Sequence, residues 1–271
     1  MLNQYRVGPI YRAGLIVTGG MCAGLGIAVL VAALARHNLS YAQLLPASVP
    51  TPPIAALGFA ACGLALVAVG FWFPQVTSVL AMVTLSLIFT LASEKFLATG
   101  PRVGGLIATN LGSTWYAVAP NTALVLLLAG AALLMRHRPR WFESQHTVIA
   151  ILGSVIFAVG VASCVGYMTG VPTYIWQSGA PMSFLSAVSS CILGIGILMS
   201  ACRYGELDDI GRPRWLPMVV CTGAVAVNMS VFVAYLVHTG QSWRASNIAS
   251  LVPMVLVSGA LSVVAARQSR A

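Results

Sequence analysis

The chain has 271 residues, of which 59% are hydrophobic and only 7% are charged, and its mean hydropathy is +0.91. A soluble domain carries about 25% charged residues because its surface faces water, so this composition excludes a soluble globular protein. The net charge of +9 does not indicate nucleic-acid binding, because the basic residues lie in short loops between apolar runs.

Eight apolar segments follow one another, at residues 13–35, 54–72, 76–98, 119–135, 147–169, 182–202, 217–238 and 251–266. Most have about 20 residues, the length at which an α-helix spans a hydrocarbon core of about 30 Å. They do not alternate apolar and polar residues with period two, which excludes the strands of a membrane barrel. We therefore predict an all-α membrane protein with eight transmembrane helices in a single domain, residues 1–271. The first segment is too long for the core of a signal peptide and is predicted to be retained.

The distribution of Lys and Arg predicts the orientation, because basic residues accumulate in cytoplasmic loops. With the N-terminus inside, the cytoplasmic side receives ten of them: Arg6, Arg12, Arg136, Arg138, Arg140, Arg203, Arg212, Arg214, Arg267 and Arg270. The opposite side receives four: Arg36, Lys95, Arg102 and Arg244. Both termini are therefore predicted to be cytoplasmic, in a multi-pass protein of the bacterial inner membrane.

The predicted outer loops are longer than most inner ones and are amphipathic. They span residues 37–53, 100–119, 170–181 and 239–250 and contain Tyr41, Trp115, Tyr116, Tyr174, Trp176 and Trp243. Such rings favour the membrane–water interface, so one interpretation is an aromatic belt. The other is a vestibule in which the same rings line a ligand site.

A repeat divides the chain into four similar helix pairs. The segments that follow the outer loops align on Gly63, Gly130, Gly194 and Gly259, which are 67, 64 and 65 residues apart. The predicted units are residues 13–72, 76–135, 147–202 and 217–266, each a helix, an outer loop and a second helix. The glycines are expected to allow close helix packing, and Pro53 and Pro120 to begin helices. All four units have the same orientation, unlike the inverted repeats of many transporters.

Residues 118–134 and the stretches 166–172, 180–183 and 193–198 resemble a family of bacterial receptors, in which "PNTALxFLLLGxALL" is a typical segment. Glu94 resembles an acidic turn of that family, although Lys95 and Phe96 depart from its pattern. In these receptors a multi-helix membrane input domain precedes a histidine kinase or diguanylate cyclase. The resemblance implies a sensory input module with a cytoplasmic kinase or cyclase as partner. Because the sequence ends at residue 271, we expect an isolated input domain or a relative that acts through a separate partner.

No catalytic motif is present, so the chain is not predicted to be an enzyme. Its cysteines form no CxxC pair, and its histidines lack the spacing of metal ligands, so no metal site is predicted. The sequence does not identify a cofactor. Lys95 is the only lysine, but its place near the end of the third segment does not suit a retinal Schiff base.

The leading hypothesis is a sensory input module that binds a small apolar or amphipathic signal at the outer end of the bundle. Ionisable residues within a membrane segment are functional candidates, which singles out Glu94. The predicted ligand-binding residues are Glu94, Trp115, Tyr116, Asn121, Tyr167 and Trp176. Alternatives are a small-solute transporter and a structural subunit of a membrane complex. A homodimer is also compatible with the sequence.

Overall fold

The computed structural model describes residues 9–36, 51–97, 118–137, 145–169 and 182–202, together with residues 223, 224 and 228. Six long helices occupy this part of the chain: α1 (Pro9–Arg36), α2 (Pro53–Phe71), α3 (Pro74–Leu97), α5 (Pro120–His137), α6 (Gln145–Thr169) and α7 (Phe184–Cys202). The described residues include no strand. The first six apolar segments are thus confirmed as helices, and their ends differ from the predicted ones by at most four residues. The seventh and eighth segments lie almost entirely outside the described residues.

Prolines define where three of the helices begin. Pro53, Pro74 and Pro120 are the first residues of α2, α3 and α5, at the position where a missing N–H costs no hydrogen bond. The prediction for Pro53 and Pro120 is therefore confirmed. At its other end α2 stops at Trp72, whose φ of 66° and ψ of 34° are left-handed. The N–H groups of Trp72 and Phe73 donate to the carbonyls of Val69 and Ala68, which closes the helix before α3 begins.

Four of the helices are long and apolar enough to cross a membrane: Tyr11–Leu34, Pro53–Phe71, Gln145–Met168 and Phe184–Ala201. Two shorter apolar helical stretches are Pro74–Ile88 and Pro120–Arg136. Large apolar side chains remain exposed on outer faces, as with Val31 and Leu34 of α1, which are 58% and 65% exposed. Apolar residues on the inside and the outside of the bundle are expected of helices surrounded by lipid.

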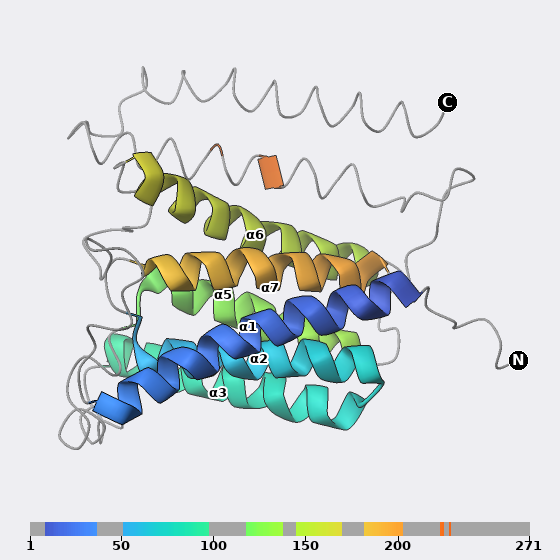
Figure 1. The fold of residues 1–271 in the computed structure, drawn as a ribbon, viewed down its shortest axis with the longest axis horizontal. Helices are drawn as coiled ribbons and strands as arrows, with labels where there is room; N and C mark the ends of the chain where they lie inside the picture. The colour runs from blue at the N-terminus through green and yellow to red at the C-terminus, as the bar shows by residue number, and fades with distance from the viewer. Residues whose placement is uncertain are drawn as a thin grey trace, which may run out of the picture.

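The helices run alternately in opposite directions and pack most extensively as α1 with α2, α3 with α5, and α6 with α7 (Figure 1). In Figure 1, α2, α5 and α7 begin at the left end of the bundle, where α1, α3 and α6 finish. One buried cluster joins the helices and includes Leu15, Phe59, Leu126, Ile156 and Leu193.

Glycines allow two of these pairs to approach closely. A Cβ atom added to Gly63 of α2 would lie 2.5 Å from the Ala23 nitrogen and 2.7 Å from the Gly19 oxygen of α1. At the corresponding place in the α6–α7 pair, a Cβ atom on Gly194 would lie 2.7 Å from the Phe157 nitrogen. The partner helices α1 and α6 also share a glycine spacing. Gly19 and Gly26 are seven residues apart, as are Gly153 and Gly160.

In the α3–α5 pair, the closest contact of the shared glycine is with a side chain and not with the backbone. A Cβ atom on Gly130 of α5 would first meet the Leu85 side chain, 2.7 Å away, and the Ala81 oxygen only at 3.5 Å. In α3, Ala81 and Ile88 occupy the places of the seven-residue glycine pairs. Both side chains are buried, so at this place side chains take the position that glycines have in the other pairs.

Candidate functional site

Three helix N-termini converge at one end of the bundle. Thr51, just before α2, and Ser183, just before α7, have their hydroxyl oxygens 2.7 Å apart. Val118, just before α5, packs against Ile54 and Ala55 of α2. Ala119 packs against Met182 and Ala187 at the start of α7, so each of the three N-termini contacts the other two. We call this region the N-terminal junction.

A chain of hydroxyl groups runs through the junction. The Ser183 Oγ lies 2.8 Å from the Ser186 Oγ and accepts a hydrogen bond of 3.2 Å from the Ser186 backbone N–H. Ser183 is therefore the N-cap of α7, and it joins this cap to Thr51 at the start of α2. All three side chains are at most 2% exposed. Such buried hydroxyl groups fix the positions of the helix ends, because breaking their hydrogen bonds would leave polar groups without partners.

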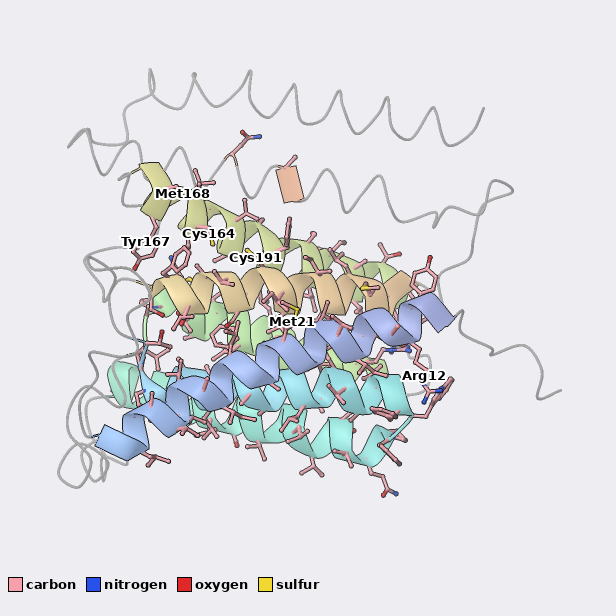
Figure 2. The ribbon with its side chains drawn as sticks, viewed as in Figure 1. Arg12, Met21, Cys164, Tyr167, Met168 and Cys191 are labelled. Carbon is pink, nitrogen blue, oxygen red and sulfur yellow. The ribbon has the colours of Figure 1, made fainter. Side chains whose placement is uncertain are left out.

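Tyr167 connects α6 to this region. Its hydroxyl donates a hydrogen bond of 2.6 Å to the Met182 carbonyl, just before α7. Its ring packs edge to face on Phe184, with centroids 5.7 Å apart and planes at 85°. Figure 2 shows Tyr167 near the end of α6, next to the start of α7. Tyr167 was predicted to belong to a ligand site, and it lies at the junction while holding α6 against α7.

Asn121, a second predicted site residue, lies in the first turn of α5. Its side chain is 8% exposed. An amide side chain carries two N–H donors and one acceptor oxygen, so Asn121 can recognise a polar group of a ligand at this end of the bundle. The neighbouring Thr122 is 2% exposed.

The structure does not describe the side chains of the other four predicted site residues. Trp115, Tyr116 and Trp176 lie outside the described residues, and Glu94 lies in the last turn of α3, where only the backbone is described. The structure thus places Asn121 and Tyr167 at the same end of the bundle and leaves the positions of the other four side chains as predictions.

The junction can recognise polar groups without using charge. The first backbone N–H groups of a helix have no partner within the helix, and its N-terminus carries a partial positive charge. The first residues of α2 and α5 have no Ser, Thr, Asp or Asn immediately before them, and Pro52 provides no side-chain cap for α2. Three converging N-termini and the Asn121 amide therefore favour a hydrogen-bond acceptor, such as a carbonyl, hydroxyl or carboxylate oxygen. Among the described residues there is no group of His, Cys, Asp and Glu that could hold a metal ion.

The opposite end of the bundle has a different character. The Arg12 guanidinium lies 5.5 Å from the centre of the Phe71 ring, which connects the beginning of α1 to the end of α2 (Figure 2). The Gln145 amide donates to the Met135 carbonyl and thereby joins the start of α6 to the last turn of α5. Basic residues near helix C-termini are stabilised by the helix dipole, so these contacts belong to the structure of the bundle.

Comparison with known proteins gives no further assignment. No protein-family model, no curated protein and no solved structure matches this chain.

Proposed function

We propose that the chain crosses the membrane eight times as four helix pairs with both termini in the cytoplasm. The packing of α1 with α2, α3 with α5 and α6 with α7 supports this proposal, because each pair is one predicted repeat unit. The helix pairs also share the position of an inward-facing glycine, at Gly63, Gly130 and Gly194. In this topology the N-terminal junction faces the outer side of the membrane.

Reporter fusions test this topology. Alkaline phosphatase fused after residues 110, 175 and 245 should be active, because these positions follow the third, fifth and seventh predicted spans and lie outside. Green fluorescent protein fused after residues 140, 208 and 271 should be fluorescent, because these positions are cytoplasmic. An active phosphatase fused after residue 271 would exclude eight spans with both termini in the cytoplasm.

We propose further that the chain is a sensory input module of the bacterial inner membrane that binds a small amphipathic signal at the N-terminal junction. The observation that carries the proposal is the buried Asn121 amide beside three converging helix N-termini. The surroundings of the junction are apolar, which suits the tail of an amphipathic molecule. The resemblance of residues 118–134 to receptor input domains supports a sensory role, with a kinase or cyclase as the partner.

A transporter is less well supported by the same residues. Further along α7, the Ser190 and Ser200 hydroxyls donate to the carbonyls of Ser186 and Ile197 in their own helix. In the described part of α7 these hydroxyls are therefore not available to line a polar path. The groups suited to a ligand are concentrated at one end.

Ligand binding can be tested with probes that share a tail and differ in the head group. Decanoic acid and 1-decanol carry acceptor oxygens, whereas decyltrimethylammonium has the same tail without an acceptor. In lipid nanodiscs, the first two should raise the free energy of unfolding by about 2.7 kcal/mol at one hundred times their Kd, whereas the third should not.

Two variants provide the matched comparison. Asn121→Leu keeps the side-chain size, removes the amide, and should abolish the stabilisation by decanoic acid and decanol. Ser200→Ala changes a buried residue at the far end of α7 and should leave the stabilisation unchanged. Equal stabilisation of Asn121→Leu and the native protein would show that the ligand site is not the junction.

A further inference from the structure

Two cysteines on neighbouring helices lie next to each other, Cys164 on α6 and Cys191 on α7. Their thiols are close enough to interact with each other. Figure 2 shows both side chains between the two helices, near the Tyr167 end of α6. Neither residue is fully buried.

The glycine packing of this pair brings the two cysteines together. A Cβ atom on Gly160 would lie 2.7 Å from the Cys191 nitrogen and 2.8 Å from its sulfur, so α6 and α7 approach closely at this level. Cys164 is one helical turn beyond Gly160, on the same face of α6. A disulfide requires close backbones and neighbouring thiols. The close approach of α6 and α7 at Gly160 brings the two cysteines near each other.

The other two cysteines with described side chains differ from this pair in their burial and in the groups that their thiols contact. Cys22 and Cys62 are completely buried. Their thiols lie against oxygen atoms, with Cys22 Sγ 3.5 Å from the Phe59 carbonyl and Cys62 Sγ 3.7 Å from the Thr84 hydroxyl. They are satisfied, inaccessible side chains and serve as internal controls.

We propose that Cys164 and Cys191 form a redox-active dithiol that a membrane-soluble quinone oxidises to a disulfide. The two S–H bonds break and one S–S bond forms, so the pair loses two electrons and two protons. The quinone accepts both electrons and both protons on its two oxygens and becomes the quinol. A thiol reductant reverses the reaction by exchange through a mixed disulfide.

The position of the pair favours this class of oxidant. Cys164 lies five residues before the end of α6, which is about 8 Å along the helix axis. At that depth in a membrane-spanning helix the surroundings are apolar, so water-soluble disulfides are largely excluded while quinones partition into the bilayer. Both cysteines are partly exposed, unlike the buried Cys22 and Cys62.

Oxidation would have a structural consequence close to the proposed ligand site. Tyr167 follows Cys164 by three residues, and its hydrogen bond to Met182 helps to hold the end of α6 to the start of α7. A disulfide one turn away would strengthen this connection until it is reduced. The dithiol would thereby report the oxidation state of the membrane quinones, independently of whether the junction binds an amphipathic signal.

The methionines of the chain allow a direct test. Cyanogen bromide cleaves after Met168 and Met182, and either cut separates Cys164 from Cys191. The reduced full chain in lipid nanodiscs is treated with decylubiquinone, its free thiols are blocked with N-ethylmaleimide, and the fragments are analysed by mass spectrometry without reduction. The expected product joins the fragments that contain Cys164 and Cys191, is two hydrogens lighter than their sum, and separates on reduction.

Variants locate the bond and provide the control. The joined product should be lost in Cys164→Ser and in Cys191→Ser and retained in Cys62→Ser. The mapping in the native chain requires no variant, so a folding defect cannot conceal the result. Blocked thiols on both fragments after quinone treatment, or a joined product that persists in Cys164→Ser, would overturn the proposal.

Discussion

The close packing of α1 and α2 leads to a quantitative prediction for Gly63→Ala. The added methyl group would lie 2.5 Å from the Ala23 nitrogen, whereas nine in ten such contacts exceed 3.4 Å. Because the nearest atoms belong to the backbone of α1, no side chain can rotate away, and the two helices must separate by up to about 0.9 Å. Overpacking of this kind costs about 1–3 kcal/mol.

The same substitution at an open position supplies the reference. Gly24 lies on the exposed face of α1, and an added Cβ atom would meet nothing within 4 Å. Gly24→Ala keeps only the gain in helix propensity, about 1 kcal/mol, which Gly63→Ala shares. The difference in free energy of unfolding between the two variants therefore isolates the steric cost and should be about 1–3 kcal/mol.

Reversible unfolding in bicelles, followed by circular dichroism as detergent is added, measures this difference. Gly194→Ala should behave like Gly63→Ala, because its nearest neighbours are backbone atoms of Phe157. Gly130→Ala should cost less, because the nearest atoms belong to the flexible Leu85 side chain. Equal stability of Gly63→Ala and Gly24→Ala, within about 0.5 kcal/mol, would refute the packing argument.

Further substitutions test the helix ends in the same assay. Ser183→Ala removes the N-cap of α7 and the contact with α2 and should cost about 0.5–2 kcal/mol. Ser200→Ala, which loses one bond within its own helix, should cost less. Tyr167→Phe keeps the ring contact and loses a hydrogen bond of 2.6 Å, so a loss of about 1 kcal/mol is expected. Trp72→Gly should be about 1 kcal/mol more stable than Trp72→Ala, because only glycine adopts the left-handed turn without strain; equal stability would show that the turn is unstrained.

Hydropathy and proline positions predict much of the described fold. Apolar runs near 20 residues identify α1, α2, α3, α5, α6 and α7, because a membrane-spanning helix must satisfy its backbone internally and present apolar side chains to lipid. Pro53 and Pro120 fix the first residues of α2 and α5 for a local reason, the missing N–H. Pro74 begins α3 in the same way, two residues before the predicted segment.

Most of the candidate site could not be predicted in this way. Ser183 and Thr51 are small polar residues at the edges of apolar runs, and nothing in the sequence pairs positions 132 residues apart. A serine in a membrane helix is most often satisfied by its own helix, as Ser200 is. Asn121 and Tyr167 were identifiable because an amide and a phenol near a helix end have polar groups that need partners.

The arrangement of the helix pairs explains why the proposed binding chemistry would lie at one end of the bundle. Each described pair turns back at the same end and brings one helix N-terminus there, so α2, α5 and α7 all begin at that end. Their partial positive charges add up, whereas at the opposite end Arg136, in the last turn of α5, faces a helix C-terminus that stabilises it. Inverting the middle pair would replace one of the three converging N-termini with a C-terminus, and the site for an acceptor group would be weakened. The parallel orientation of the pairs is therefore the feature that connects the sequence repeat to the proposed binding of an acceptor-bearing signal.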